Sequence, residues 1–476
     1  MATEKEQLEQ VFADTVAQKV DWVQYNQDGK AVGVKYVELA DLIIKEHPFL
    51  AVPFGDELTY YSYNGVSWDK VTKARAKEQT ERYAFDYLKS ADVYRPRRMQ
   101  DVAKTVLVNG QQDHNPFTDQ NTDRVAFKNG TYMLDSGEMR PNGPKDYLIN
   151  GHQIEAQPGK ASPNINAWGS YLFGPSWQYV KEVLGYAFIP EQTTFNTITI
   201  LLDETGGSGK SYFVEKIVRP LIGQNNITAK DIDTLTGSNG KSNRFGTFDL
   251  INKLANIHLD IPDTRIDMPD TLKTLSGGDV VEVEGKGTNS VSVKLYALLI
   301  FASNNKPKIA VSSALLQRMH LVPVVAPKVR DNPQEARARA SLWNEEKAVK
   351  ELGGFAIECI EAFKQAKAQG RLSVNDEIEE VTKDWATSQD LVATFLLEAK
   401  KEMPEGYTGG ISKQVAFARY REWLIDNGIE SKINKKSFGT VLEQKGFLSI
   451  KTRNHPEGDN SGNVASWLGL DLEKYN

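Results

Sequence analysis

The stretch Thr205-Gly206-Gly207-Ser208-Gly209-Lys210-Ser211 decides the fold class of this 476-residue chain. An apolar run of strand length, Ile198–Leu202, comes before it, and Tyr212–Leu221, whose apolar residues recur at helical spacing, comes after it. A glycine-rich loop that ends in Lys-Ser between a strand and a helix is typical of loops that surround phosphates with backbone N–H groups. The stretch therefore predicts an α/β core that binds a nucleoside triphosphate.

The residues Thr205–Ser211 are the candidate nucleotide ligands. Lys210 would neutralise the β- and γ-phosphates, and Ser211 would bind Mg²⁺. Glu204 stands where the usual pattern has its first glycine, so the backbone angle that glycine supplies must arise in another way. The alternative interpretation is a glycine-rich turn that binds no ligand.

A second cluster, Gly237–Ser242, has a similar order of residues. It follows no apolar strand, and we expect no helix to begin at Asn243. It is therefore interpreted as a surface loop or a segment that faces DNA, and not as a second nucleotide site.

Three further residues lie next to apolar runs and are candidates for hydrolysis of the nucleotide. Asp260 ends the run Leu254–Leu259, and an acid at this place can bind Mg²⁺ and orient the attacking water. Asn304 follows the run Tyr296–Ser303 and can sense the γ-phosphate. Arg318 precedes another apolar run and can stabilise the transition state in a neighbouring subunit. Each has an ordinary alternative, namely an acid after a strand, an Asn-rich turn and a surface arginine.

The composition excludes several classes of protein. Apolar residues make up 40% and charged residues 25% of the chain, which is typical of a globular protein. We find no apolar run of membrane-spanning length, and Met1–Lys5 does not begin a secretory leader, so we expect neither a membrane partner nor secretion. The one cysteine, Cys359, excludes an intrachain disulfide and a cysteine-based zinc site. The net charge of −6 means that any surface for nucleic acid must be local.

The rest of the chain is divided by its patterns into further domains. The sequence pattern of residues 1–165 predicts a mixed α+β domain, with a helix at Lys5–Lys19 and a hairpin at the turn Asn64-Gly65. The glycine- and proline-containing stretch Gln157–Pro175 is interpreted as a linker. The core is expected at residues 176–330, with a mostly parallel central sheet, and a helical segment at 331–405. No carboxylate pair or cysteine cluster in the first domain indicates primer synthesis, so we expect it to serve assembly or DNA loading.

The last part, residues 406–476, predicts two helices followed by two strands, which is the outline of a winged-helix module. Nine basic residues oppose four acidic residues between positions 411 and 455, so this segment is basic in an acidic protein. Lys435 and Lys436, at the start of the second helix, are candidate DNA contacts.

The order of these features resembles that of superfamily-three replicative helicases of phages, plasmids and mobile elements, related to the poxvirus primase-helicase. The most specific feature is the run Lys273-Thr274-Leu275-Ser276-Gly277-Gly278-Asp279, between Asp260 and Phe301-Ala302-Ser303-Asn304. Glu204 departs from the pattern, and so does Leu259, where many members have a second acid.

The resemblance implies an AAA+-like core that forms a ring, usually a homo-hexamer, with ATP and Mg²⁺ between subunits. It implies translocation on single-stranded and forked DNA in the cytoplasm of a bacterial host, with a separate primase or initiator as a possible partner. In the family a hairpin enters the ring channel. Val281 and Val283 alternate before a turn, and Val291 and Val293 alternate after it, so Lys286 and Lys294 are candidate DNA contacts.

Two rival functions stay open at this point. A DNA-packaging motor would carry a nuclease domain with clustered carboxylates after the core, and here a basic module follows instead. A non-enzymatic replication initiator or DNA-binding scaffold that only binds nucleotide is favoured by Glu204 and Leu259.

Overall fold

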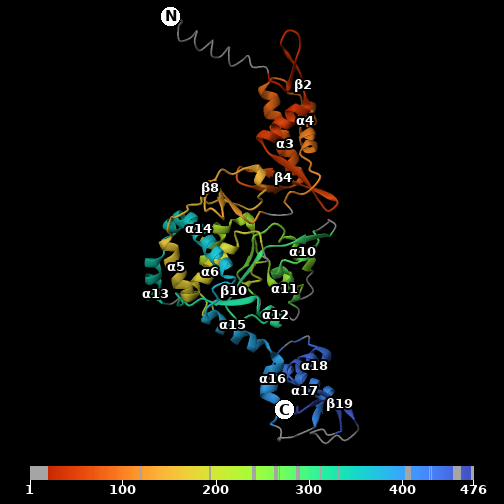
Figure 1. The fold of residues 1–476 in the computed structure, drawn as a ribbon, viewed down its shortest axis with the longest axis vertical. Helices are drawn as coiled ribbons and strands as arrows, with labels where there is room; N and C mark the ends of the chain where they lie inside the picture. Colours follow the sequence, from red (N-terminus) through yellow and green to blue (C-terminus); the bar gives the residue numbers. More distant parts are fainter. Residues whose placement is uncertain are drawn as a thin grey trace. The chain divides into compact units, whose positions relative to one another are not determined.

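A computed structural model describes residues 20–117, 121–191, 194–237, 243–261, 266, 269–285, 290–310, 312–329, 332–402, 409–427, 429, 431, 433–453 and 463–472. It divides into two compact units (Figure 1), one of residues 1–156 with 287–291 and one of residues 157–286 with 292–476. The predicted helix Lys5–Lys19, Lys286 and most of Gly237–Ser242 lie outside the described residues. The first unit ends at Ala156, before the predicted domain end at position 165.

The first unit begins with small antiparallel sheets and three helices. Phe49, Ala51 and Leu88 are among the buried residues that join its sheet and helices in one core. The predicted hairpin at Asn64-Gly65 is confirmed, since its two flanking strands pair from Tyr63 opposite Trp68. The elements are β1 (Val23–Tyr25), β2 (Ala31–Val34), α2 (Tyr36–Glu46), β3 (Phe49–Phe54), β4 (Glu57–Tyr63), β5 (Trp68–Val71), α3 (Lys73–Ser90) and α4 (Pro96–Asn109).

A four-stranded sheet completes the first unit, in the order β8-β7-β6-β9. Asp146 accepts hydrogen bonds from Arg124 and Arg140 beside this sheet, so a largely buried carboxylate is neutralised by two guanidinium groups. The elements are β6 (Arg124–Phe127), β7 (Gly130–Met133), β8 (Met139–Arg140), η1 (Pro144–Asp146) and β9 (Gly151–His152).

The second unit is built on a five-stranded parallel sheet in the order β11-β12-β15-β10-β16. The predicted mostly parallel sheet is confirmed. All residues of β10 and β15 are buried, because helices cover both faces of the sheet, and this explains the uninterrupted apolar runs in the sequence. The strands are β10 (Ile198–Leu202), β11 (Ile227–Thr228), β12 (Ala255–His258), β15 (Leu298–Ser303) and β16 (Met319–Pro323).

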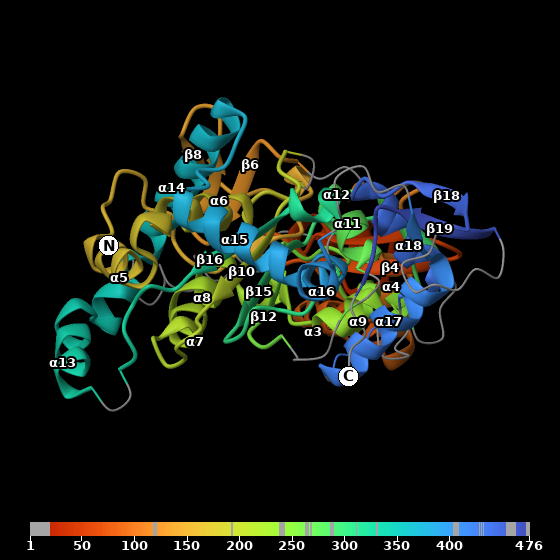
Figure 2. The ribbon, with the colours of Figure 1, turned by 90° about the horizontal axis from the view of Figure 1, so that it is seen from below.

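Helices surround this sheet, and two of them differ from what the sequence predicts. The predicted linker Gln157–Pro175 is wrong, because it contains helix α5 (Pro163–Phe173); Pro163 occupies the first helical turn, where no N–H is needed, and Trp168 and Leu172 face the core. Helix α10 (Asn243–Phe248) begins where we expected none. In Figure 2 the strands lie at the centre of this unit and α13 at its edge.

The remaining helices lie around the sheet and after it in the chain. The helices after the sheet confirm the helical segment that the sequence predicts there. They are η2 (Gly174–Ser176), α6 (Trp177–Tyr186), α7 (Lys210–Phe213), the π-helix η3 (Val214–Val218), α8 (Arg219–Ile222), η4 (Gln224–Asn226), α9 (Ile232–Thr236), α11 (Asp270–Gly277), α12 (Ser313–Leu316), α13 (Pro333–Leu342), α14 (Glu345–Gln369) and α15 (Asp376–Gln389).

The C-terminal part has a core of its own around Phe395, Tyr420 and Trp423. Two helices precede a pair of antiparallel strands, as predicted, and a third strand pairs with β19 to give the order β17-β19-β18. The elements are α16 (Leu391–Ala399), β17 (Gly410–Ser412), α17 (Lys413–Asp426), α18 (Lys435–Gln444), β18 (Ser449–Thr452) and β19 (Val464–Leu468).

Among the described residues, no helix has both the length and the apolar character needed to cross a bilayer. The same residues contain no cluster of three or more His, Cys, Asp or Glu side chains arranged to bind a metal ion.

Candidate functional site

The glycine-rich loop connects β10 to helix α7 at the carboxyl edge of the parallel sheet. Gly206, Gly207 and Gly209 have φ angles of +66°, +79° and +113°, which is the region that favours glycine. The helix that begins at Lys210 continues through a π-helical turn to Ile222, so the loop leads directly into a helix N-terminus. The strand, loop and helix predicted from the sequence therefore lie in the predicted order.

The carboxylate of Asp203, which the sequence analysis did not single out, holds this loop by hydrogen bonds on the buried side. Its carboxylate accepts hydrogen bonds from the Ser208 hydroxyl at 2.6 Å, from the Gly206 N–H at 2.9 Å and from the Thr205 hydroxyl at 3.1 Å. Asp203 is 2% exposed, and Ser208 is fully buried. The only sequence feature that points to Asp203 is its position directly after a buried strand and before the loop. This position does not reveal which groups the carboxylate binds.

Lys210 lies at the same edge with its amine in the site. The Nζ atom donates to the Ser303 carbonyl oxygen at 2.7 Å and to Asn304 Oδ1 at 2.9 Å, so the structure brings two of the predicted catalytic residues together. Burial lowers the pKa of Lys210 from its usual value, while the charges of Asp203 and Asp260 act in the opposite direction.

Asp260 and Ser211 are the candidate Mg²⁺ ligands. Strands β12 and β15 pair with His258 opposite Phe301, and continuing this register places Asp260 level with Ser303 at the edge that holds Lys210. Asp260 and Ser211 are both exposed. A carboxylate and a hydroxyl supply the oxygen donors that Mg²⁺ prefers, so these residues fit the ion.

Arg318 lies at the amino end of the strands, opposite the end that carries the glycine-rich loop. The Ile198 N–H, at the start of β10, donates to the Arg318 carbonyl oxygen, whereas the loop follows the end of β10. The five residues of β10 separate the two ends of the strand by roughly 16 Å. The guanidinium donates to the Lys273 carbonyl oxygen and to Ser276 Oγ on α11. The structure therefore does not bring Arg318 to the loop of its own chain.

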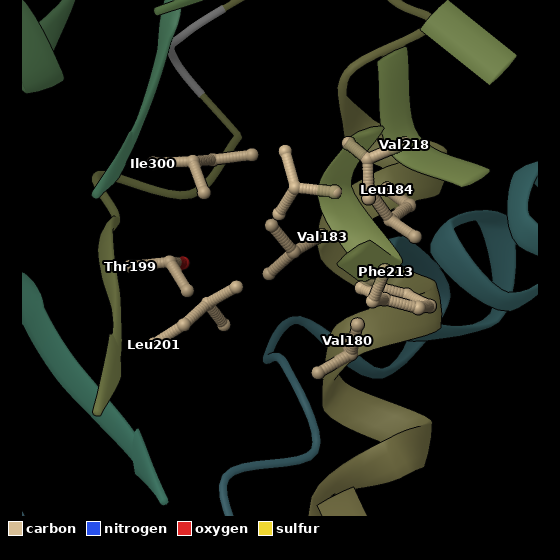
Figure 3. A pocket seen from close by; sticks show the side chains of 9 residues that line it. Val180, Val183, Leu184, Thr199, Leu201, Phe213, Val218 and Ile300 are labelled. Carbon is tan, nitrogen blue, oxygen red and sulfur yellow. The ribbon is translucent and has the colours of Figure 1, made fainter. Parts of the chain in front are cut away.

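An apolar pocket lies between the sheet and the helices behind the loop. Figure 3 shows Thr199, Leu201 and Ile300 on the strands, with side chains of α6 and of the helix that follows the loop opposite them. The hydroxyl of Thr199 is already hydrogen-bonded to Tyr179. This lining offers no charge to a phosphate, so the pocket is a packing gap beneath the loop helix and not the nucleotide site.

The candidate DNA-contact residues that the structure describes lie in two places, the hairpin and the start of α18. The predicted hairpin has the strands β13 (Val280–Val283) and β14 (Val291–Lys294), which form a two-stranded sheet. Lys294 is exposed at the end of β14. Lys435 and Lys436 are exposed in the first turn of α18 and, with Lys413, line a groove over Trp467.

The elements on either side of the second glycine cluster differ from those on either side of the first. Helix α9 ends at Thr236, so a helix and not a strand precedes this cluster. Because α10 begins at Asn243, the expectation that no helix follows it is wrong, but the strand that a phosphate-binding loop requires is missing before it.

Comparison with known proteins gives two family matches. Residues 202–318 match a family of unknown function (DUF5906), and residues 40–173 match a family described as D5 N terminal like. Two solved structures of the NrS-1 C-terminal region in its apo form are similar at 12% identity. The first covers 87% of this chain and 87% of that chain with a TM-score of 0.48, and the second covers 92% and 99% with a TM-score of 0.47.

The D5-like match covers most of the first unit and ends at residue 173, ahead of the parallel sheet. It confirms the resemblance of this chain to the replicative helicases of phages and mobile elements related to the poxvirus primase-helicase.

Proposed function

We propose that this chain is an ATP-dependent DNA helicase that forms a ring and translocates on single-stranded DNA during replication of a phage or mobile element. The observation that carries the proposal is the position of Lys210. Its ammonium lies at the carboxyl edge of a parallel sheet, next to Asn304 and at the end of a loop with three left-handed glycines. An ammonium group, a helix N-terminus and the backbone of a glycine-rich loop at one place favour a polyphosphate.

Hydrolysis at this edge would use residues of the same chain for binding and for water. The residues Thr205–Ser211 would surround the phosphates, and Lys210 would move from the Ser303 carbonyl to the β- and γ-phosphates. Asp260 would orient a water molecule for attack on the γ-phosphorus, and Asn304 would hold that water or the γ-phosphate. Ser211 and Asp260 would hold Mg²⁺, which neutralises phosphate charge when bound.

A neighbouring subunit would complete the site. Arg318 lies at the far edge of its own sheet, so it would act on a nucleotide held by the next copy in a homo-hexamer or similar ring. Lys286 and Lys294 would contact DNA phosphates in the ring channel, and Lys435 and Lys436 would contact the duplex or fork as part of a winged-helix module. A separate primase or initiator would be a further partner, in the cytoplasm of a bacterial host.

The decisive experiment measures ATP hydrolysis with and without single-stranded DNA, for the wild-type chain and for Lys210→Met. We expect hydrolysis that DNA stimulates in the wild type and none in the variant. Methionine keeps most of the side-chain volume of a largely buried lysine, so the variant should remain folded. Tight nucleotide binding without any hydrolysis would instead support the non-enzymatic initiator, which the half-buried Leu259, in place of a second acid, favours.

A further inference from the structure

Arg339 is the residue of helix α13 that faces the glycine-rich loop. Its Nη1 atom lies 3.4 Å from the Ser208 carbonyl oxygen. A Cβ atom added to Gly209 would lie only 2.7 Å from the Nη2 atom, so the guanidinium occupies the space beside that glycine. The same guanidinium lies 4.6 Å from the ring centroid of Trp168 and 5.7 Å from that of Tyr212.

Helix α13 is tied to the helix that follows the loop. The Trp343 indole N–H donates to the Tyr212 hydroxyl at 3.0 Å, and that hydroxyl donates to Glu345 Oε2 at 3.0 Å. At the other end of α13, the Tyr171 hydroxyl donates to Glu335. Since Tyr212 comes directly after Ser211, these contacts hold Arg339 at a fixed place relative to the loop.

The charge of Arg339 is not neutralised by a carboxylate. Within the described part of the chain it makes no ion pair, and its polar contact is the Ser208 carbonyl oxygen. A guanidinium that is half-buried against aromatic rings and lacks a counter-ion favours an anion nearby. Lys328 lies on the same stretch of chain, with Cγ 3.6 Å from a Cβ atom added to Gly207, so two cations border the loop.

We infer that Arg339 binds the phosphates of a nucleoside triphosphate held by the loop of its own chain. This inference rests on the proposed function, because it requires a nucleotide at the loop. Arg339 and Arg318 have different roles, since Arg339 contributes to binding in the same subunit, whereas Arg318 would act on the nucleotide of the next subunit. The planar guanidinium, held on the face of Trp168, would approach the phosphates with two N–H groups.

The test is a titration of intrinsic tryptophan fluorescence with ATP and Mg²⁺, and with ADP, because Trp168 and Trp343 lie within the contacts described. For Arg339→Gln we expect about tenfold weaker binding of both nucleotides, since one charge-assisted contact is lost. Arg339→Lys should recover part of the affinity. Arg337→Gln changes the same charge on an exposed residue of the same helix and should bind as the wild type does.

Each other outcome has a definite meaning. Wild-type affinity in Arg339→Gln would overturn the inference and leave the proposed function standing, provided that Lys210→Met binds weakly. A lower melting temperature of nucleotide-free Arg339→Gln, together with weaker binding, would assign the residue a structural role and would also overturn the inference. A wild-type chain that binds no nucleotide would overturn both. Nucleotide binding that depends on Arg339 in a chain that never hydrolyses ATP would refute the helicase and support the inference.

Discussion

Replacing Asp203 with alanine tests whether the glycine-rich loop is held in shape from inside the fold. The carboxylate accepts three hydrogen bonds, of which the one from Ser208 is fully buried. Thr205 is exposed and Gly206 is half-buried, so water can replace the carboxylate at these two donors. The Ser208 hydroxyl cannot be rehydrated, and an unsatisfied buried donor costs about 1–3 kcal/mol. We therefore expect Asp203→Ala to lower the free energy of unfolding by about 2–3 kcal/mol.

The assay for this variant combines denaturant unfolding with nucleotide binding. Without the Asp203 carboxylate, the loop must be ordered by the ligand when it binds. Nucleotide affinity should therefore fall as well, by roughly tenfold for each 1.4 kcal/mol of ordering free energy. Asp384→Ala is the matched control, since it removes an exposed carboxylate from helix α15 in the same unit. Equal stability and equal affinity of the two variants would refute the idea that Asp203 maintains the loop.

Three further outcomes are expected. Burial lowers the pKa of His320 to about 4, so between about pH 6.5 and 4 the unfolded chain binds a proton that the folded chain does not. The free energy of unfolding should therefore fall by about 3 kcal/mol as the pH falls through this window. The variant His320→Gln should show a weaker pH dependence of its melting temperature over the same window. Lys286→Ala with Lys294→Ala should leave basal ATP hydrolysis near normal and remove strand separation, and retained unwinding would exclude the hairpin as the DNA grip. Lys435→Ala with Lys436→Ala should weaken duplex binding and reduce the salt dependence of binding by about two phosphate contacts, and an unchanged slope would argue against this helix as a DNA contact.

The core strands could be predicted to within a few residues, because strands buried on both faces must be continuous apolar runs. Ile198–Leu202 coincides with β10, and the run Tyr296–Ser303 contains β15. The loop could be predicted for a related reason, since only glycine adopts its positive φ angles without strain. Proline and glycine are misleading signals elsewhere. Pro163 is interpreted from the sequence as part of a linker, and in the structure it starts a helix that buries Trp168.

The surroundings of the site could not be predicted, because they depend on contacts between residues far apart in the sequence. The loop pattern predicts that Lys210 contacts phosphate, but it does not predict that this lysine is 3% exposed and bonded to Ser303 and Asn304. Arg339 comes from a helix that begins more than a hundred residues after the loop, and α13 has an amphipathic pattern too weak to show which face is docked. The sequence around Arg339 carries no local pattern that distinguishes it from a surface residue.

The most family-specific run of the sequence has a physical role in the fold of its own chain, since it holds Arg318 in place. The run Lys273–Asp279 contains the last residues of α11 and the two residues after it, and the Lys273 carbonyl oxygen and Ser276 Oγ accept hydrogen bonds from Arg318. A Cβ atom added to Gly277 would lie 3.1 Å from the Arg318 guanidinium, so a side chain there would crowd it. The run therefore fixes Arg318 at the end of the strands that lies away from the glycine-rich loop of its own chain. Because Arg318 lies across the sheet from the loop of its own chain, the proposed function requires that it act on a nucleotide held by a second copy.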